Sequence, residues 1–546
     1  MCLRKEITVL VDGGLQVSQG TLVLLNSLLQ MTGSDKRQDS LYDAVTGSYL
    51  LWNGEIFDGL PVEKGQNDGV CLLHELSKCD TQDDFAQCFS RLRGPWAAIY
   101  FHNASKTIWF GKDVMGRKSL LIKKPSPTDS TLLISSVLST QFAESVVEEI
   151  PPGIYCMKVE ILLGNILLEE YDLDSVIQKI PWQDECLLAL SSFRRTFDKA
   201  KTGIHSESNS VEKANALIQI LKTSVLKRCV SVEYPLMLDD NPESLGQARY
   251  MVLFSGGVDS TLVASLMHRV LPPTERIDLC SICFANGNSP DRISAIDAYK
   301  ELKETCSGRE WRFIEIDSSY IEVQDSLSHL LEILFPCDTV MDFNIGGALW
   351  MASNGVGSWV DYSPSENGGY RRLLIDPVYR SRARTVFMGH GADELFGGYG
   401  RHRTKFRNFG RQGLSEELRL DIRRLWKRNF GRDDRVISDH GKEARLPFMD
   451  EQVIRFALET ELEVLVDLNL PIGKGDKIIL RNCLRILGLG RTAARQKRAL
   501  QFGSRLAKAA NDAQFGGTRK ANQHFAGKVR LSEVPLADDM PKSLVD

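Results

Sequence analysis

A short apolar run that ends in two glycines is the feature that most constrains the fold of this chain. Residues 250–254, YMVLF, predict a buried strand, and the tripeptide Ser255-Gly256-Gly257 ends it. Apolar side chains then recur at helical spacing from Leu262 to Leu271. The segment therefore predicts a strand, a glycine turn and a helix. The N–H groups of the turn and of the helix N-terminus would together form an anion site.

A phosphate-bearing ligand is what the side chains around this turn indicate. Ser255 and Ser260 add hydroxyl donors, and Asp259 can hold a Mg²⁺ ion that bridges phosphates. The spacing is not that of a Walker A loop, because the Gly-Lys-Ser/Thr ending is missing, and it is not a dinucleotide fingerprint. The alternative interpretation is an ordinary turn between a strand and a helix.

A second segment repeats the order of strand, glycines and polar residues. Residues 385–399, TVFMGHGADELFGGY, come after strands predicted at 277–284 and 311–317 and a helix predicted near 291–305. Alternating strands and helices indicate a parallel sheet covered on both faces, with ligands beyond the carboxyl ends of its strands. We therefore expect the two glycine loops to share one crevice.

Composition limits the classes of protein that need to be considered. A chain of 546 residues is too long to fold around one hydrophobic core, so two or three domains are expected. A net charge of −4 argues against a nucleic-acid binder, and no apolar stretch approaches the roughly 20 residues of a membrane helix. The 12 cysteines are scattered, and the pair Cys280 and Cys283 lies in an apolar run that predicts a buried strand rather than a metal site. No signal peptide is visible, and we expect a cytosolic protein without nucleic-acid or membrane partners.

The N-terminal region contains the elements of a nucleophilic site. If Met1 is removed, the α-amine of Cys2, with an unperturbed pKa of about 8, can take the proton of its own thiol. Asn53 and the N–H group of Gly54 could form an oxyanion hole. Short strands with turn signals between residues 93 and 155 predict a layered sheet domain.

Several motifs in the same order carry a resemblance to a known family. Met1-Cys2 and the segments NGEIF, GKDVMGRKSLLI, LISS and EIPPGIY resemble the class II, N-terminal-nucleophile glutamine amidotransferases. The run SGGVDS resembles the PP-loop of ATP pyrophosphatases. Together they resemble the glutamine-hydrolysing asparagine synthetases, and in particular a divergent branch of that family.

The resemblance implies a domain order and a fold for each domain. Residues 1–180 would form an α+β N-terminal-nucleophile glutaminase, and residues 246–530 an α/β PP-loop domain with a parallel sheet. Residues 181–245 would link them and include a core-packed helix near 211–230, and residues 531–546 would form a flexible tail.

The resemblance also assigns roles to single residues. Cys2 would be the glutaminase nucleophile, and Lys497 would stabilise charge in the acyl-adenylate step. Glutamine would be held by Asn53, Gly54, Glu55 and Asp68. ATP and pyrophosphate would be held by Leu253, Ser255, Gly256, Gly257, Asp259, Ser260, Met388 and Gly389. Mg²⁺ would be held by Asp259 and Asp393.

The implied reaction is glutamine-dependent asparagine synthesis. Ammonia released at Cys2 would attack an aspartate side chain that ATP has adenylated, giving asparagine, AMP and pyrophosphate. The small-molecule partners would thus be glutamine, aspartate and ATP, with Mg²⁺ as cofactor. Protein partners are left open by the sequence, a homo-oligomer among them.

Three departures from the family pattern point to altered activity. Leu3 stands where a glycine is usual, and the arginine that normally clamps the substrate carboxylate is missing, with only Lys36 and Arg37 nearby. The family's Gly-Glu-Gly-Ala-Asp-Glu reads with a histidine at His390, which can act as a base but brings no fixed negative charge. We therefore expect weakened amide synthesis that His390→Glu would raise.

Other interpretations remain beside this one. The chain could be a weakened or inactive synthetase-like interaction protein, or it could amidate a different carboxylate. An RNA-modifying PP-loop enzyme is a third alternative, against which Cys2, NGEIF and the acidic charge argue. Residues 354–384, rich in Gly, Ser and Arg, are predicted to be an inserted segment that forms a loop over the site or is disordered.

Overall fold

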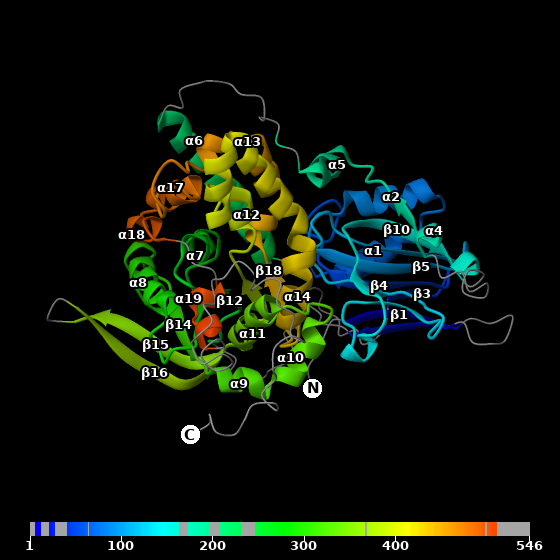
Figure 1. The fold of residues 1–546 in the computed structure, drawn as a ribbon, viewed down its shortest axis with the longest axis horizontal. Helices are drawn as coiled ribbons and strands as arrows, with labels where there is room; N and C mark the ends of the chain where they lie inside the picture. The colour runs from blue at the N-terminus through cyan, green and yellow to red at the C-terminus, as the bar shows by residue number, and fades with distance from the viewer. Residues whose placement is uncertain are drawn as a thin grey trace.

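The computed structural model describes most of the chain and shows its elements in the arrangement of Figure 1. The described residues are 6–12, 21–27, 41–63, 65–162, 173–193, 195, 207–230, 246–365, 369–496 and 500–509.

The N-terminal part contains two antiparallel sheets. The five-stranded sheet has the order β2-β1-β8-β7-β9, and the six-stranded sheet has the order β11-β10-β6-β5-β4-β3. The first consists of β1 (Glu6–Asp12), β2 (Thr21–Ser27), β7 (Leu121–Lys123), β8 (Leu132–Ser135) and β9 (Val147–Glu149). The second consists of β3 (Leu41–Asp43), β4 (Ser48–Gly54), β5 (Trp96–His102), β6 (Thr107–Lys112), β10 (Gly153–Lys158) and β11 (Gln178–Ile180).

The two faces of the six-stranded sheet pack against different layers. Leu51 and Ile99 belong to the core that also contains Ile134 of the other sheet. Trp52 and Tyr100, their neighbours along the strands, pack on the opposite face with α1 (Asp68–Leu76) and α2 (Gln82–Arg91). This period of two follows from the alternation of side chains along a strand. The layered sheet that the sequence predicts in this region is therefore present. The helical segments that follow are η1 (Thr140–Phe142), α4 (Leu173–Val176) and α5 (Glu185–Ser192).

The C-terminal part is built on a seven-stranded sheet with the order β16-β15-β14-β13-β12-β17-β18. Five neighbouring strands are parallel, and β15 and β16 extend the sheet in the antiparallel sense. The parallel strands are β14 (Trp311–Asp317), β13 (Ile277–Cys283), β12 (Tyr250–Leu253), β17 (Thr385–Phe387) and β18 (Glu443–Arg445). The strands predicted by the sequence are confirmed, and Cys280 and Cys283 are buried in β13 as expected.

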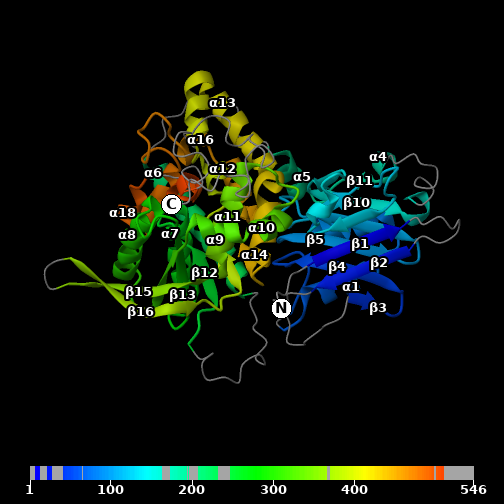
Figure 2. The ribbon, with the colours of Figure 1, turned by 60° about the horizontal axis from the view of Figure 1, so that its bottom comes forward.

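Helices cover this sheet and complete an α/β layout (Figure 2). The helix predicted near 211–230 is α6, and its buried Leu217, Leu221 and Val225 pack it against α7 and α17. The helical segments are α6 (Glu207–Val230), α7 (Val258–Val270), α8 (Pro290–Thr305), α9 (Tyr320–Asp325), α10 (Leu327–Leu334), α11 (Val340–Asn354), α12 (Ala392–Phe396), α13 (Gly400–Leu425), η3 (Trp426–Phe430), α14 (Gly431–Ser438), η4 (Pro447–Met449), α15 (Glu451–Glu459), α16 (Leu462–Leu465), α17 (Ile478–Ile486), α18 (Gly490–Ala493) and α19 (Leu500–Gly503). In the part of the chain that the structure describes, none of them is long and apolar enough to cross a membrane.

The segment 354–384 differs from its prediction. It forms a hairpin of β15 (Val356–Pro364) and β16 (Tyr370–Arg380), which extends away from the rest of the molecule (Figure 1). Glu315 in β14 accepts hydrogen bonds from Tyr362 at 2.7 Å and from Arg372 at 2.6 Å, which fasten the hairpin to the sheet. The expectation of a loop over the site or a disordered segment is wrong, because aromatic and β-branched residues between the Gly and Ser positions support strands.

Candidate active site

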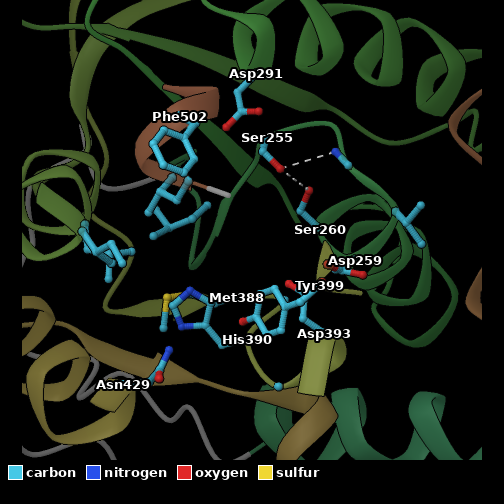
Figure 3. Close-up of a pocket in the computed structure, with 18 of the residues that line it drawn as sticks. Ser255, Asp259, Ser260, Asp291, Met388, His390, Asp393, Tyr399, Asn429 and Phe502 are labelled. Carbon is cyan, nitrogen blue, oxygen red and sulfur yellow. Dashed lines mark hydrogen bonds between the residues drawn. The ribbon is translucent and has the colours of Figure 1, made fainter. Parts of the chain in front are cut away.

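A cavity of about 440 Å³ lies at the carboxyl ends of β12 and β17. β12 is the first strand of its sheet in sequence, and β13 and β17 flank it on opposite sides. This is the point at which an open α/β sheet forms a crevice for ligands. Both glycine loops line the cavity, as the sequence predicted, and Figure 3 shows their side chains around it.

The two glycines of the turn after β12 have different roles: Gly256 determines the backbone conformation, and Gly257 borders the cavity. Gly256 has a φ of +68°, and a Cβ there would overlap the backbone of Ser294 and Ala295. Gly257 lines the cavity, where an added Cβ would meet only Ser255 Oγ, at 3.3 Å. Ser255 Oγ also lies 3.4 Å from Ser260 Oγ (Figure 3). Gly256 therefore sets the turn, whereas Gly257 leaves room for a ligand next to the backbone.

The N-terminus of α7 opens into this turn. Gly257 is its N-cap and provides no side-chain hydrogen bond to the first N–H groups of the helix. Such N–H groups and the helix dipole favour a phosphate. Arg495 supports the turn from behind, because its guanidinium donates to the carbonyls of Gly256 and Ser294, both at 2.8 Å. This role of Arg495 was not predicted, because Gly256 and Ser294 lie about 200 or more residues away in the sequence.

A buried lysine joins the two loops. Lys477 Nζ lies 2.6 Å from Asp259 Oδ2 and 2.7 Å from Asp393 Oδ1. Burial would lower the pKa of Lys477, but the two carboxylates hold it above its ordinary value, so the ammonium stays charged. Lys477 was not predicted as a site residue, because its partners are far away in the sequence.

The same two carboxylates are the predicted Mg²⁺ ligands. They fit an ion that is held by one or two carboxylates together with nucleotide phosphates, which is the usual protein environment of Mg²⁺. They do not form a cage for a metal by themselves: among the described residues, no group of three or more His, Cys, Asp or Glu side chains could hold an ion. The neighbouring Glu394 accepts a hydrogen bond from Tyr399 at 2.6 Å. Asp259 and Asp393 therefore remain the candidates for Mg²⁺ that arrives with a nucleotide.

His390 has a carboxylate partner that the sequence did not reveal. Its Nδ1 lies 3.0 Å from Oδ2 of the buried Asp433, and 28% of the His390 side chain is exposed to the cavity. Burial would raise the pKa of Asp433, but Arg432 and His390 lower it below its ordinary value. The histidine itself carries no fixed negative charge, but the carboxylate of Asp433, which is also paired with Arg432, lies next to it.

Comparisons with known proteins show the family of this chain. The model of the asparagine synthase family matches residues 245–306 and 408–514. The "Asparagine synthetase domain-containing protein 1" of Mus musculus is 32% identical over 556 residues, covering 85% of this chain and 86% of the mouse protein. This chain belongs to the asparagine synthetase family. The human protein of the same name is 31% identical over 554 residues, covering 85% and 84%. An asparagine synthetase (glutamine-hydrolyzing) of Sandersonia aurantiaca is 27% identical over 239 residues, covering 42% and 38%.

The predicted glutamine-binding residues of this asparagine synthetase family member lie close together at the end of β4. Asp68 is buried and accepts hydrogen bonds from the N–H groups of Ile56 at 3.1 Å and Gly69 at 2.9 Å. Asn53 Nδ2 lies 3.5 Å from Asp434 Oδ2. A side chain at Gly54 would come within 2.7 Å of the Pro95 carbonyl, so the two strands approach as closely as a glycine permits. Cys2, Leu3, Lys36, Arg37 and Lys497 lie outside the described residues.

Glu55 makes a contact that its predicted role does not include. Both of its carboxylate oxygens accept hydrogen bonds from Arg445 of β18, one of them at 2.5 Å, and both side chains are buried. A bidentate pair of this kind is the strongest arrangement of a carboxylate with arginine. Glu55 therefore already neutralises a buried cation, which weakens its attraction for the ammonium group of a free substrate.

Buried ion pairs connect the N-terminal and C-terminal parts. Lys118 Nζ lies 3.0 Å from Asp434 and 2.6 Å from Glu443. Arg117 and Glu451 are 2.6 Å apart, and Arg435 and Glu149 are 2.9 Å apart. Burial would lower the pKa of Lys118, but Asp434 and Glu443 raise it above its ordinary value. The contact is thus held by complementary charges that are removed from water.

Proposed function

We propose that this chain catalyses the ATP-dependent amidation of a carboxylate, with the side chain of L-aspartate as the first acceptor to test. The observation that carries the proposal is the glycine turn, which opens an uncapped helix N-terminus into a cavity that also holds Lys477. Phosphate binding is favoured there by backbone N–H groups, by the helix dipole and by a buried cation. Family membership supports the same chemistry.

In the proposed reaction, the acceptor carboxylate attacks the α-phosphorus of ATP. The bond between the α-phosphorus and the bridging oxygen breaks, and pyrophosphate leaves. Ammonia then attacks the acyl carbon, and AMP leaves with the electrons of the acyl–oxygen bond. Lys477 and the N–H groups of the turn would stabilise the charge on the phosphates. Mg²⁺ bound with the nucleotide would neutralise further phosphate charge.

His390 is our candidate for the proton transfer in the second step. Its Nδ1 faces Asp433, which would orient the ring and leave Nε2 to accept the proton that the attacking nitrogen loses. An arrangement of histidine and carboxylate is a common way to hold the ring of a general base.

Residues 1–180 would supply the nitrogen by hydrolysing glutamine at Cys2, and residues 246–530 would form the synthetase. The ion pair of Glu55 with Arg445 favours a second candidate, in which the synthetase uses ammonia from solution and glutamine is a poor donor. We place both reactions in the cytosol.

One experiment separates these candidates. The full chain is incubated with ATP, MgCl₂ and L-aspartate, together with either glutamine or ammonium chloride, and pyrophosphate and asparagine are quantified. We expect both products with ammonium chloride and less with glutamine. Equal rates with both donors would rule out the second candidate. Pyrophosphate without asparagine would point to another acceptor, and neither product from protein that binds no ATP would overturn the proposal.

A matched pair of glycine variants tests whether the turn binds the nucleotide. Gly257→Val places a side chain in the cavity without overlapping the backbone, so the protein should fold but lose ATP binding. Gly256→Ala forces a strained backbone against Ser294 and should mainly lower the thermal midpoint. ATP binding measured by calorimetry and unfolding measured by heating provide the two readouts. If Gly257→Val binds ATP as tightly as the wild type, the turn is not the phosphate site.

A further inference from the structure

The hairpin of β15 and β16 presents an open sheet edge that the proposed reaction does not use. β16 is the first strand in the order of the seven-stranded sheet, and among the described residues it pairs only with β15. The hairpin extends away from the rest of the molecule in the views of both Figure 1 and Figure 2. The unpaired N–H and C=O groups along such an edge can form hydrogen bonds with a strand of another chain.

Apolar side chains are exposed along this edge, and the features that prevent pairing are confined to one end of it. The exposed fraction is 51% for Leu374, 49% for Ile375 and 75% for Val378. Open edges usually carry charges, proline or irregular backbone, which keep other chains from pairing with them. In β16, Pro377 has no N–H group, and Asp376 Oδ1 accepts a hydrogen bond from the N–H of Val378 at 2.9 Å. Pairing is therefore blocked beyond Asp376 but not before it.

The first half of β16 is regular and firmly held. From Tyr370 to Leu374 the strand stays in register with β15. The Tyr370 hydroxyl donates a hydrogen bond to Glu304 Oε1 of α8 at 2.5 Å, and Arg372 donates to Glu315 of β14 at 2.6 Å. An edge that is already ordered loses little conformational entropy when it pairs with another strand.

A bulge gives this half of the strand a pattern that is complementary to itself. The register with β15 shifts after Leu374, because Ile375 is an extra residue without a partner in β15. Arg371, Leu373 and Asp376 consequently share one face of the sheet. Their partners are alternate residues of β15: Ser363, Asp361 and Trp359. Along this face the strand begins with a cation, continues with an apolar side chain and ends with a carboxylate.

We propose that this edge pairs with the same edge of a second copy of the chain, antiparallel and with Leu373 at the two-fold axis. The basic start of each strand then lies opposite the acidic end of the other, so that Arg371 faces Asp376 and the two leucines meet between these pairs. Arg371 is exposed, and in the described part of the chain it has no ion pair. An interface that uses the same patch on both copies closes as a dimer.

The order of the charges selects this arrangement among the possible ones. A parallel arrangement would place the two Arg371 side chains next to each other, and like charges directly opposite one another are destabilising. A strand of another protein would need the same order of cation, apolar side chain and carboxylate, which a second copy already has. Solvation alone, the ordinary state of single exposed apolar residues, does not account for an edge that is protected only beyond Asp376.

The molar mass of the purified full chain in solution tests the proposal. Sedimentation velocity from about 1 to 200 µM should show a monomer that converts to a dimer, because pairing over a few residues gives a small, weak interface. Leu373→Lys would place two lysines side by side at the axis and should weaken the dimer at least about 10-fold. Val378→Lys is the matched control, since it adds the same charge to an exposed apolar position beyond Pro377. It should leave dimerisation within about 2-fold of wild type.

Two charge variants distinguish this strand pairing from any other contact between copies. Arg371→Glu and Asp376→Lys each place like charges opposite one another twice in the homodimer, and each should weaken it about 10-fold or more. An equimolar mixture of the two variants brings opposite charges together at both positions, so the mixture should dimerise like the wild type. Thermal midpoints of the same samples show whether each variant is folded.

Three results would each overturn the proposal. The first is a wild-type protein that stays monomeric at the highest concentration. The second is a mixture of Arg371→Glu and Asp376→Lys that is no more dimeric than its components. The third is a loss of dimer in Val378→Lys as large as that in Leu373→Lys.

Discussion

At the scale of single residues, the contact of His390 with Asp433 changes the expected result of a substitution. His390→Glu would place a second carboxylate next to a buried one, and like charges at this distance repel. We therefore expect His390→Glu to slow ammonia-dependent asparagine formation rather than raise it. The double variant His390→Glu with Asp433→Asn should recover part of the loss, because the repulsion is removed.

His390→Ala tests the proposed proton transfer itself and should lower the rate by about 10²-fold or more. ATP binding should stay within about 2-fold of wild type in all of these variants. An increase of the rate in His390→Glu alone would show that Asp433 does not supply the charge at this site.

Much of the site could be predicted at this scale, for a simple reason. The turn at Ser255–Ser260 and the loop at Met388–Asp393 are local patterns whose order along the chain determines where they lie on a parallel sheet. Asp433 and Lys477 could not be predicted, because an ion pair leaves no local pattern when its members are separated by many residues. The partnership of Glu55 with Arg445 could not be predicted either, because the two residues lie 390 positions apart.

At the scale of elements, the hairpin of β15 and β16 was missed because its Gly, Ser and Arg content resembles that of a loop. It is tied to the central sheet by Tyr379, whose hydroxyl lies 3.0 Å from Asp278 Oδ2 in β13. Burial raises the pKa of Asp278 to about 6, although Ser381 and Tyr379 oppose the shift. The folded state therefore retains the proton of this carboxyl to a higher pH than the unfolded chain does.

This raised pKa gives a pH dependence of stability with a defined sign. An unfolded aspartate has a pKa of about 3.9, so the contribution of Asp278 is complete below about pH 4 and is lost as the pH rises through about 6. The asparagine in Asp278→Asn cannot ionise. As the pH rises from 4.5 to 7, the thermal midpoint of this variant should therefore increase relative to that of wild type. The full difference corresponds to on the order of 3 kcal/mol. Parallel curves for the two proteins over this range would contradict the assignment.

At the scale of the whole molecule, the contact between the N-terminal and C-terminal parts contains buried charges beside an apolar cluster to which both parts contribute. Lys118→Met would leave Asp434 and Glu443 buried without their shared cation. Removing one partner of a buried ion pair typically lowers the free energy of unfolding by about 3–5 kcal/mol. The thermal midpoint should therefore fall, and proteases should cut between the two parts more readily.

Lys124→Met is the matched control for this variant. Lys124 is partly exposed and contacts Glu148 at 3.5 Å, and exposed ion pairs contribute about 0–1 kcal/mol. A similar loss in both variants would mean that the buried pairs do not hold the contact. This contact could not be predicted from the sequence, because its partners lie between 286 and 334 residues apart.

The adjacent residues Asp433 and Asp434 on α14 connect the cavity with the predicted glutamine-binding residues. Asp433 contacts His390 in the cavity, while Asp434 contacts Lys118 and Asn53 on the other side of the same helical turn. If a ligand at one end displaces this turn, the contacts at the other end change as well. Thermodynamic linkage then requires the same coupling free energy in both directions. If the two proposed reactions take place at these ends, binding of the substrate at one end would change the affinity for the substrate at the other, through this short helix.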